Sequence, residues 1–179
     1  MVTLPDSKVL VIGPKWDGDK LNPWVYDVKK NTWSNKLTPD GPTIQALVGE
    51  FPKTSGICIE NSVYIAAADV LCILDISSPD HWDMVHLECD HGIAPSMVSF
   101  SSTKMVILGG LQQDHTYSDL VTVVDLESRC MDNSLPRLSP EELGLTNQDA
   151  TQFKDDNGNL MAFQIMNSSN KDGYRMSII

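Results

Sequence analysis

The chain has little of what marks a membrane-spanning, secreted or nucleic-acid-binding protein. No apolar run approaches the roughly 20 residues that span a bilayer, and the first residues lack the charged and apolar regions of a signal peptide. Lysine and arginine number 13 against 24 aspartates and glutamates, which gives a formal net charge of −11. Such a charge repels phosphate backbones and anionic membranes. We therefore expect a cytoplasmic protein with no nucleic-acid or membrane partner.

Motifs for catalysis and for metal binding are also scarce. The sequence has no Gly-x-Ser-x-Gly motif, no Walker-type run and no glycine-rich loop leading into a helix. Its four cysteines are scattered, so we expect reduced packing residues rather than disulfides. Glu88-Cys89-Asp90-His91 has metal-ligand residue types, but no second Cys/His pair lies at a zinc spacing. We expect no catalytic residue, no metal and no cofactor.

The sequence does contain one short motif that occurs three times. In each copy apolar residues surround an aspartate: Val25-Tyr26-Asp27-Val28, Ile73-Leu74-Asp75-Ile76 and Val123-Val124-Asp125-Leu126. The aspartates stand 48 and 50 residues apart, and Trp33 and Trp82 follow the first two by 6 and 7 residues. A repeat of this period, built from short β-rich runs, indicates a propeller or a similar array.

The runs around each aspartate predict an all-β fold. Short aliphatic segments at 8–13, 62–67 and 104–110 end in small residues and precede the aspartate strands. The segments at 56–59 and 96–100 precede two of these runs across polar turns, so they predict hairpins. A polar turn and a short closing strand follow each aspartate. The pattern therefore predicts four antiparallel strands per repeat.

These features together resemble the kelch repeat of β-propellers, the fold of the central domain of galactose oxidase. The family pattern is a strand ending in a glycine pair, then a Tyr-Asp strand, then a tryptophan about six residues later. The corresponding residues here are Gly13-Pro14, Tyr26-Asp27 and Trp33, then Ala66-Ala67, Leu74-Asp75 and Trp82, then Gly109-Gly110, Val124-Asp125 and Cys130-Met131. The resemblance covers nearly the whole chain and implies that each tryptophan packs between neighbouring blades.

The predicted architecture is a single incomplete β-propeller of about three to four blades. We place the blades at approximately 1–37, 55–88, 94–133 and 150–179. Kelch propellers typically close with more blades, and an open array leaves unpaired faces. Three explanations stay open: a piece of a longer protein, two copies closing one ring, or packing against another chain.

Antiparallel strands place the connections at two opposite ends of the array, and the longer loops share one end. These loops lie at 14–23, 37–54, 111–119 and 133–149. Long loops on a rigid scaffold are where binding usually occurs. Two of them combine aromatic and polar side chains, which is the character of interface anchors. The candidate binding residues are Trp16, Asp17, Asp19, Gln113, His115 and Tyr117.

Two functions from different classes remain. The resemblance implies a non-enzymatic protein–protein interaction module or scaffold that binds another protein, or a second copy, through its long-loop face. The alternative is a fragment of a propeller enzyme, galactose oxidase-like or sugar-processing, whose catalytic residues lie outside this chain; a remnant without activity is a third possibility. The three aspartates at matching positions are better explained as scaffold than as catalytic carboxylates, because an aspartate that closes a strand can accept hydrogen bonds from the following turn.

Overall fold

The described strands pair antiparallel and follow one another in sequence order within each sheet. The computed structural model describes residues 1–11, 24–34, 55–67, 69–79, 82–92, 95–99, 101–112, 114, 116–137, 150–154, 160–164 and 177–178. The first four-stranded sheet consists of β1 (Val2–Leu4), β2 (Lys8–Val11), β3 (Trp24–Asp27) and β4 (Thr32–Ser34). The second consists of β5 (Ser55–Ile59), β6 (Ser62–Ala67), β7 (Val70–Asp75) and β8 (Asp83–His86).

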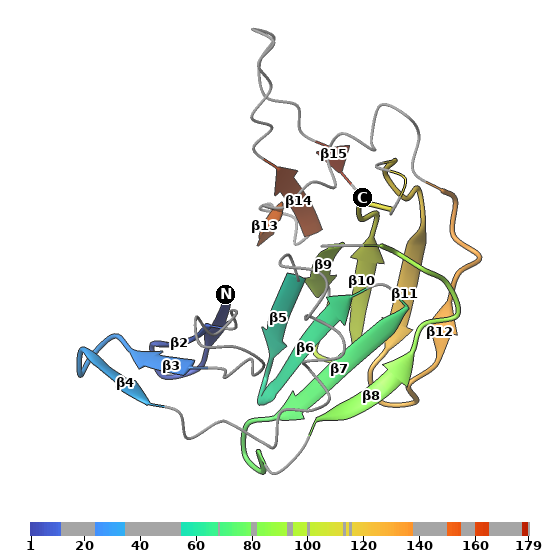
Figure 1. The fold of residues 1–179 in the computed structure, drawn as a ribbon. Coiled ribbons are helices and arrows are strands. Elements are labelled where there is room, and N and C mark those ends of the chain that lie inside the picture. Colours follow the sequence, from blue (N-terminus) through green and yellow to red (C-terminus); the bar gives the residue numbers. More distant parts are fainter. Residues whose placement is uncertain are drawn as a thin grey trace, which may run out of the picture. The chain divides into compact units, whose positions relative to one another are not determined.

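Two further sheets complete the described part of the chain (Figure 1). The third is four-stranded and consists of β9 (Ser96–Ser99), β10 (Lys104–Leu108), β11 (Val121–Asp125) and β12 (Met131–Asp132). The fourth has three strands, β13 (Ala150–Lys154), β14 (Leu160–Gln164) and β15 (Ser177–Ile178). Within the described ranges there is no helix, and so none that could cross a membrane. The all-β prediction is confirmed, and three four-stranded meanders are compatible with a partial propeller of about three blades.

The repeated aspartate has the same structural role in all three four-stranded sheets. Asp27 Oδ1 accepts a hydrogen bond from the Lys30 N–H at 3.0 Å. Asp75 Oδ1 accepts the Ser77 N–H at 2.8 Å and the Ser77 hydroxyl at 2.6 Å. Asp125 likewise accepts from the N–H of Ser128 at 2.9 Å and from its hydroxyl at 2.8 Å. The scaffold interpretation of these carboxylates is therefore confirmed.

These hydrogen bonds also lower the pKa of each aspartate. The backbone N–H of Lys30 has the largest effect on the pKa of Asp27, the hydroxyl of Ser77 on that of Asp75, and the backbone N–H of Ser128 on that of Asp125. A carboxylate that accepts several such bonds is stabilised in its charged form. The turns are thus held by ionised aspartates at neutral pH.

Contacts divide the chain into two compact units, Met1–Leu87 and Glu88–Ile179. In the first unit, one face of the sheet β1–β4 packs against one face of the sheet β5–β8. The strand register places Val2, Leu10 and Val25 side by side on the first of these faces. Their partners in the core come from β6, β7 and the residue before β8: Val63, Ile65, Val70, Cys72, Leu74 and Trp82.

The approach of β5 to β1 requires a residue without a side chain. A Cβ atom added to Gly56 on β5 would lie 2.6 Å from Val2 Cγ2. The two sheets therefore meet closely at this point.

The two repeat tryptophans differ in burial although their register is the same. Trp33 pairs with Tyr26, the residue before Asp27. Trp82 precedes Asp83, which pairs with Ile73, so it stands beside Leu74, the residue before Asp75. Trp82 is 7% exposed within the core, whereas Trp33 is 57% exposed.

The expectation that both tryptophans pack between blades therefore holds for Trp82 and is wrong for Trp33. Trp33 lies on the face of β1–β4 opposite to Leu10 and Val25, because Tyr26 and Val25 alternate along β3. Its ring packs instead on Tyr26, with ring centroids 4.9 Å apart. Trp24, two residues before Tyr26, shares this open face and is also exposed.

In the second unit, the sheet β9–β12 is buried on both faces along its central strands. Met105 and Ile107 of β10 and Thr122 of β11 are fully buried. Val106, Leu108 and Val121 form a cluster on which Val123 packs. The connections at the ends of this sheet therefore begin from buried strands.

Candidate functional site

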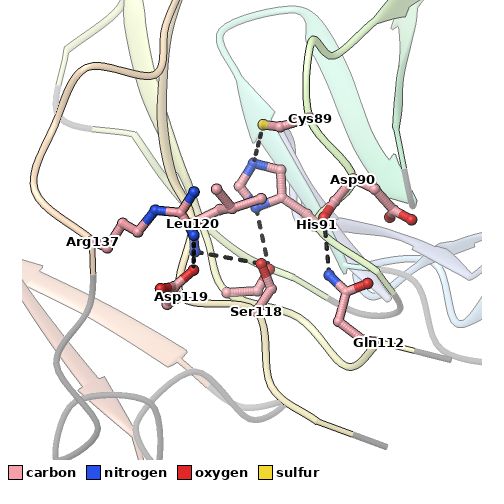
Figure 2. Close-up of polar contacts among 9 residues, drawn as sticks. Cys89, Asp90, His91, Gln112, Ser118, Asp119, Leu120 and Arg137 are labelled. Carbon is pink, nitrogen blue, oxygen red and sulfur yellow. Dashed lines mark hydrogen bonds and ion pairs between the residues drawn. The ribbon is translucent and has the colours of Figure 1, made fainter. Parts of the chain in front are cut away.

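Three connections of the second unit are joined by polar contacts. They are the segment Glu88–Gly92, the loop Gly109–Leu120 between β10 and β11, and the segment Asn133–Arg137 after β12; we call them together the connection surface. Gln112 Nε2 donates to the Asp90 carbonyl at 3.0 Å, and the Arg137 guanidinium donates to Asp119 Oδ1 at 2.7 Å, as Figure 2 shows. Of the predicted long loops, 111–119 and 133–149 are joined by the contact between Asp119 and Arg137, whereas 14–23 and 37–54 lie outside the described residues, so the shared end of all four loops stays a prediction.

The β10–β11 loop continues the hairpin beyond its strands. Gly109 donates its N–H to the Leu120 carbonyl at 3.0 Å, and Ser118 donates to the Gly110 carbonyl at 2.8 Å. Both glycines have positive φ angles, 60° and 117°, and the second lies where only glycine is readily accommodated. The glycine pair therefore turns the chain out of β10 into this extension.

The tip of the same loop is fixed by a second set of hydrogen bonds. Leu111 and Tyr117 form an antiparallel bridge, and the Gln112 N–H donates to the Thr116 carbonyl at 2.8 Å. Asp114 Oδ1 accepts the N–H of Thr116 at 2.9 Å and its hydroxyl at 2.6 Å. This Asx turn is a common way to close a tight turn. Hydrogen bonds thus join the described residues of this loop, 109–112, 114 and 116–120, across its two sides.

The segment before β9 packs tightly against this loop. Gly92 has a φ of +75°, and a Cβ atom there would lie 2.4 Å from the Leu111 carbonyl oxygen. The neighbouring Asp90 accepts the Gly92 N–H through Oδ1 at 2.7 Å. A glycine is therefore required where the two connections meet.

A polar cluster lies at the base of the connection surface. His91 is 0% exposed. Its Nδ1 is 3.2 Å from the Gly109 carbonyl oxygen and its Nε2 is 2.8 Å from Thr122 Oγ1. The Sγ of the half-buried Cys89 is 3.5 Å from the same Nε2, and Figure 2 shows the two side chains pointing toward one another. Thr122 also donates to Asn133 Oδ1 at 2.6 Å.

Burial lowers the pKa of His91, while the hydrogen bond to the Gly109 carbonyl and the charge of Asp90 act in the opposite direction. The imidazole is therefore neutral near pH 7. Because a carbonyl can only accept, Nδ1 carries the proton and Nε2 is the acceptor. His91 is a fixed tautomer with its basic nitrogen turned to Cys89 and Thr122.

Of the predicted binding residues, the structure describes one. Tyr117 is 40% exposed on the β10–β11 loop. The other five, Trp16, Asp17, Asp19, Gln113 and His115, lie outside the described residues. The binding assignment itself stays a prediction.

Sequence reasoning missed several residues that build this surface. Gln112 carries the contact to the Glu88–Gly92 segment, and Arg137 pairs with Asp119 across 18 positions of sequence. The Cys-x-His spacing of Cys89 and His91 is a signal in the sequence, but it indicates only a metal-ligand pattern, which is set aside because no second Cys/His pair lies at a zinc spacing. In the described part of the chain no three His, Cys, Asp or Glu residues gather as metal ligands.

The cysteines are all free thiols, as predicted, but only two of them pack in a core. Cys72 is buried and Cys58 packs against the core of the first unit. Cys130 is exposed, and Cys89 belongs to the polar cluster. The packing role is therefore wrong for Cys89 and Cys130.

Comparisons with known proteins add no family. No protein-family model matches the chain, and no curated protein matches it. Among solved structures, the tricorn protease is similar with a TM-score of 0.49 and 15% identity, over 96% of this chain and 16% of that one. A chain in the S. cerevisiae complex of Dbp5 with Nup159, Gle1, IP6 and ADP is similar with a TM-score of 0.45 and 12% identity, over 99% of this chain and 41% of that one. This chain thus spans less than half of either structure.

Proposed function

We propose that this chain is a kelch-type propeller segment that acts as a non-enzymatic protein–protein interaction module or scaffold, binding another protein through the connection surface. One observation supports this most: the side chain of Tyr117 is 40% exposed, while its backbone is held by the antiparallel bridge to Leu111. A rigid aromatic side chain provides contact area at low entropic cost, so tyrosines are frequent binding hot spots.

The surroundings of Tyr117 have the mixed character of an interface. Asp119, two residues after Tyr117, forms an ion pair with Arg137 of the segment after β12. Leu135 of that same segment is exposed. Arginine and tyrosine are enriched where proteins meet, with polar groups at the rim. The free thiols support a reducing compartment, and we propose the cytoplasm.

An affinity experiment with matched variants tests this function. The full chain, Tyr117→Ala and Met84→Ala are immobilised and exposed to lysate, and bound proteins are identified by mass spectrometry; Met84 is an exposed apolar residue on β8 of the other unit. Each candidate partner is then purified and titrated against the three chains. We expect a partner whose affinity falls about 30-fold with Tyr117→Ala, since a hot spot contributes about 2 kcal/mol or more, and is unchanged with Met84→Ala. Equal affinity for all three chains would contradict the proposal.

A second partner, another copy of the chain, is supported by the open face of β1–β4. On β5–β8 the register-equivalent tryptophan, Trp82, is covered by the aliphatic face of Leu10 and Val25. Trp33 stands at the equivalent position of β1–β4, but no described residue of the first unit covers it as Leu10 and Val25 cover Trp82, and it is exposed. We propose that a sheet of a second copy packs there. Because each copy carries a net charge of −11, repulsion opposes this contact and salt should strengthen it.

Light scattering on a size-exclusion column tests the second copy directly. The expected mass is twice the 19.8 kDa of the chain at high protein concentration, with more dimer as salt is raised. Trp33→Ser should remain a monomer, while Met84→Ser should dimerise like the natural sequence. A monomer under all conditions, or an undiminished dimer with Trp33→Ser, would refute this contact without touching the Tyr117 proposal.

A further inference from the structure

Three polar side chains converge on the sulfur of Cys89, one from its own segment, one from β11 and one from the segment after β12. His91 Nε2 is 3.5 Å, Thr122 Oγ1 3.3 Å and Asn133 Oδ1 3.6 Å from Cys89 Sγ. The cluster lies within the second unit, and neither the propeller repeat nor the interaction surface requires it. The reactivity of the Cys89 thiol depends on which groups of the cluster donate hydrogen bonds and which accept them.

Counting donors and acceptors shows where the thiol proton goes. His91 Nδ1 donates to Gly109, so Nε2 only accepts. Thr122 has one hydroxyl proton and faces two acceptors, Asn133 Oδ1 at 2.6 Å and His91 Nε2 at 2.8 Å. When Thr122 donates to Asn133, the Cys89 S–H is the remaining donor for Nε2. When Thr122 donates to Nε2, the S–H turns to Asn133, and rotation of both the Thr122 hydroxyl and the Cys89 S–H restores the first arrangement.

We infer that Cys89 is a thiol modification site at which His91 acts as the base and the reagent is a low-molecular-weight disulfide. In the step, the Cys89 sulfur attacks one sulfur of the disulfide, a new S–S bond forms and the original S–S bond breaks. The Cys89 proton passes to His91 Nε2 and then to the departing thiolate. One protein thiol and one disulfide thus become one mixed disulfide and one small thiol. A nucleophile, a base within hydrogen-bond reach and a third group that orients the base are the usual components of such a site.

The imidazolium formed during the step is accommodated by the same cluster. Its Nδ1–H keeps the Gly109 carbonyl, and its new Nε2–H faces Thr122 Oγ1. Asp90 is the charged group that acts on His91, and its negative charge favours the imidazolium. Thr122, which contacts the ring at Nε2, and Asn133, which contacts Thr122, are uncharged.

The other cysteines provide internal controls. Burial raises the pKa of Cys72 to about 12 and also raises the pKa of Cys58, so neither readily forms a thiolate. Cys130 is exposed. If access alone governed the reaction, Cys130 would react before the half-buried Cys89; assistance by His91 reverses this order.

The test is the reaction of the folded full chain with an aromatic disulfide, 5,5′-dithiobis(2-nitrobenzoate), with the modified cysteine identified by peptide mass spectrometry. We expect Cys89 to be modified first, at least tenfold faster than Cys130 at pH 7. Cys89→Ser should remove the fast phase and Cys130→Ser should leave it intact. Modification of Cys130 first would overturn the inference.

The pH dependence of the natural chain is a second readout that needs no substitution in the cluster. An unassisted thiol loses about tenfold in rate for each pH unit below a pKa of about 8.5, because only the thiolate reacts. With neutral His91 as base, the Cys89 rate should instead stay nearly level from pH 8 down to pH 6. A tenfold fall per unit at Cys89 would overturn the inference.

His91→Asn completes the test, because the asparagine amide can still donate to Gly109 but has no basic nitrogen. General-base assistance contributes about 10²-fold or more, so this variant should slow Cys89 by at least tenfold and restore the steep pH profile. If the variant does not fold, the natural chain's order of modification and pH profile decide the question.

Discussion

Replacement of Trp82 by alanine tests how the two sheets of the first unit are held together. Trp82 is 7% exposed and packs with Leu10, Val25 and Leu74, which come from both sheets. Truncation of a buried tryptophan removes its transfer energy and leaves a cavity, at a cost of about 3–5 kcal/mol. One term acts in the other direction, because Trp82 Nε1 is buried without a hydrogen-bond partner among the described residues.

Removal of such an unpartnered N–H relieves about 1 kcal/mol or more of desolvation cost. We therefore expect Trp82→Ala to lower the free energy of unfolding by about 3 kcal/mol, at the lower end of the range for this substitution. Trp82→Phe keeps a ring in the core and removes the N–H, so it should change stability by less than about 1 kcal/mol. Urea denaturation followed by circular dichroism measures both changes.

Trp33→Ala is the matched control, since it removes the same residue at the same register of the neighbouring sheet. Trp33 is exposed, and its main contact is the ring of Tyr26. Such an aromatic pair contributes about 0.5–1.5 kcal/mol, so the loss should stay below that of Trp82→Ala. Equal losses at the two positions, or a loss at Trp82 below about 0.5 kcal/mol as at surface sites, would refute the packing described here.

Three further predictions follow from single contacts. Since hydrogen bonds from Ser77 hold the pKa of Asp75 below its ordinary value, the stability from its charged form is complete above pH about 4 and is lost as pH falls through the folded pKa. The urea concentration at half unfolding, measured from pH 7 to pH 3, should fall less steeply with acid in Asp75→Asn than in the natural sequence. The same fall in both chains would contradict the role of Asp75 in the turn. Gly92→Ala should cost more than about 1 kcal/mol in the same assay, because its φ is positive and its Cβ would meet Leu111; a neutral change would show that the two connections separate easily. Cys72, whose thiol pKa is raised to about 12 by burial, should resist iodoacetamide until urea unfolds the chain, and rapid labelling in the native state would contradict its core position.

The sequence predicted the parts of the fold that depend on neighbouring residues. Asp27, Asp75 and Asp125 each accept hydrogen bonds from residues two or three positions later. Each copy of the motif therefore forms a similar turn through local contacts. The hairpins are equally local, because each strand pairs with the next one in the chain. Apolar alternation and turn residues are enough to indicate both.

What depends on distant residues could not be predicted. Trp33 and Trp82 share a sequence signature, and only the sheet that packs on each one determines whether it is buried. The cluster around Cys89 is of the same kind, since His91 meets Thr122 across 31 positions of sequence. Comparison of nearby residues cannot detect such contacts, and for this reason the Cys-x-His pair indicates from the sequence only a metal-ligand pattern, which is set aside.

The order of strands within each sheet has a consequence for how the chain folds. Because every described strand of a four-stranded sheet pairs with a strand adjacent to it in sequence, the contacts within each sheet are local, and closing the sheet costs less loop entropy than pairing strands that are distant in the chain. Sheets joined in this way can form one after another, and the energy that couples them lies in contacts such as those around Trp82. The first unit should therefore fold rapidly for an all-β protein. When the packing between its two sheets is weakened, each sheet should unfold in a separate cooperative step.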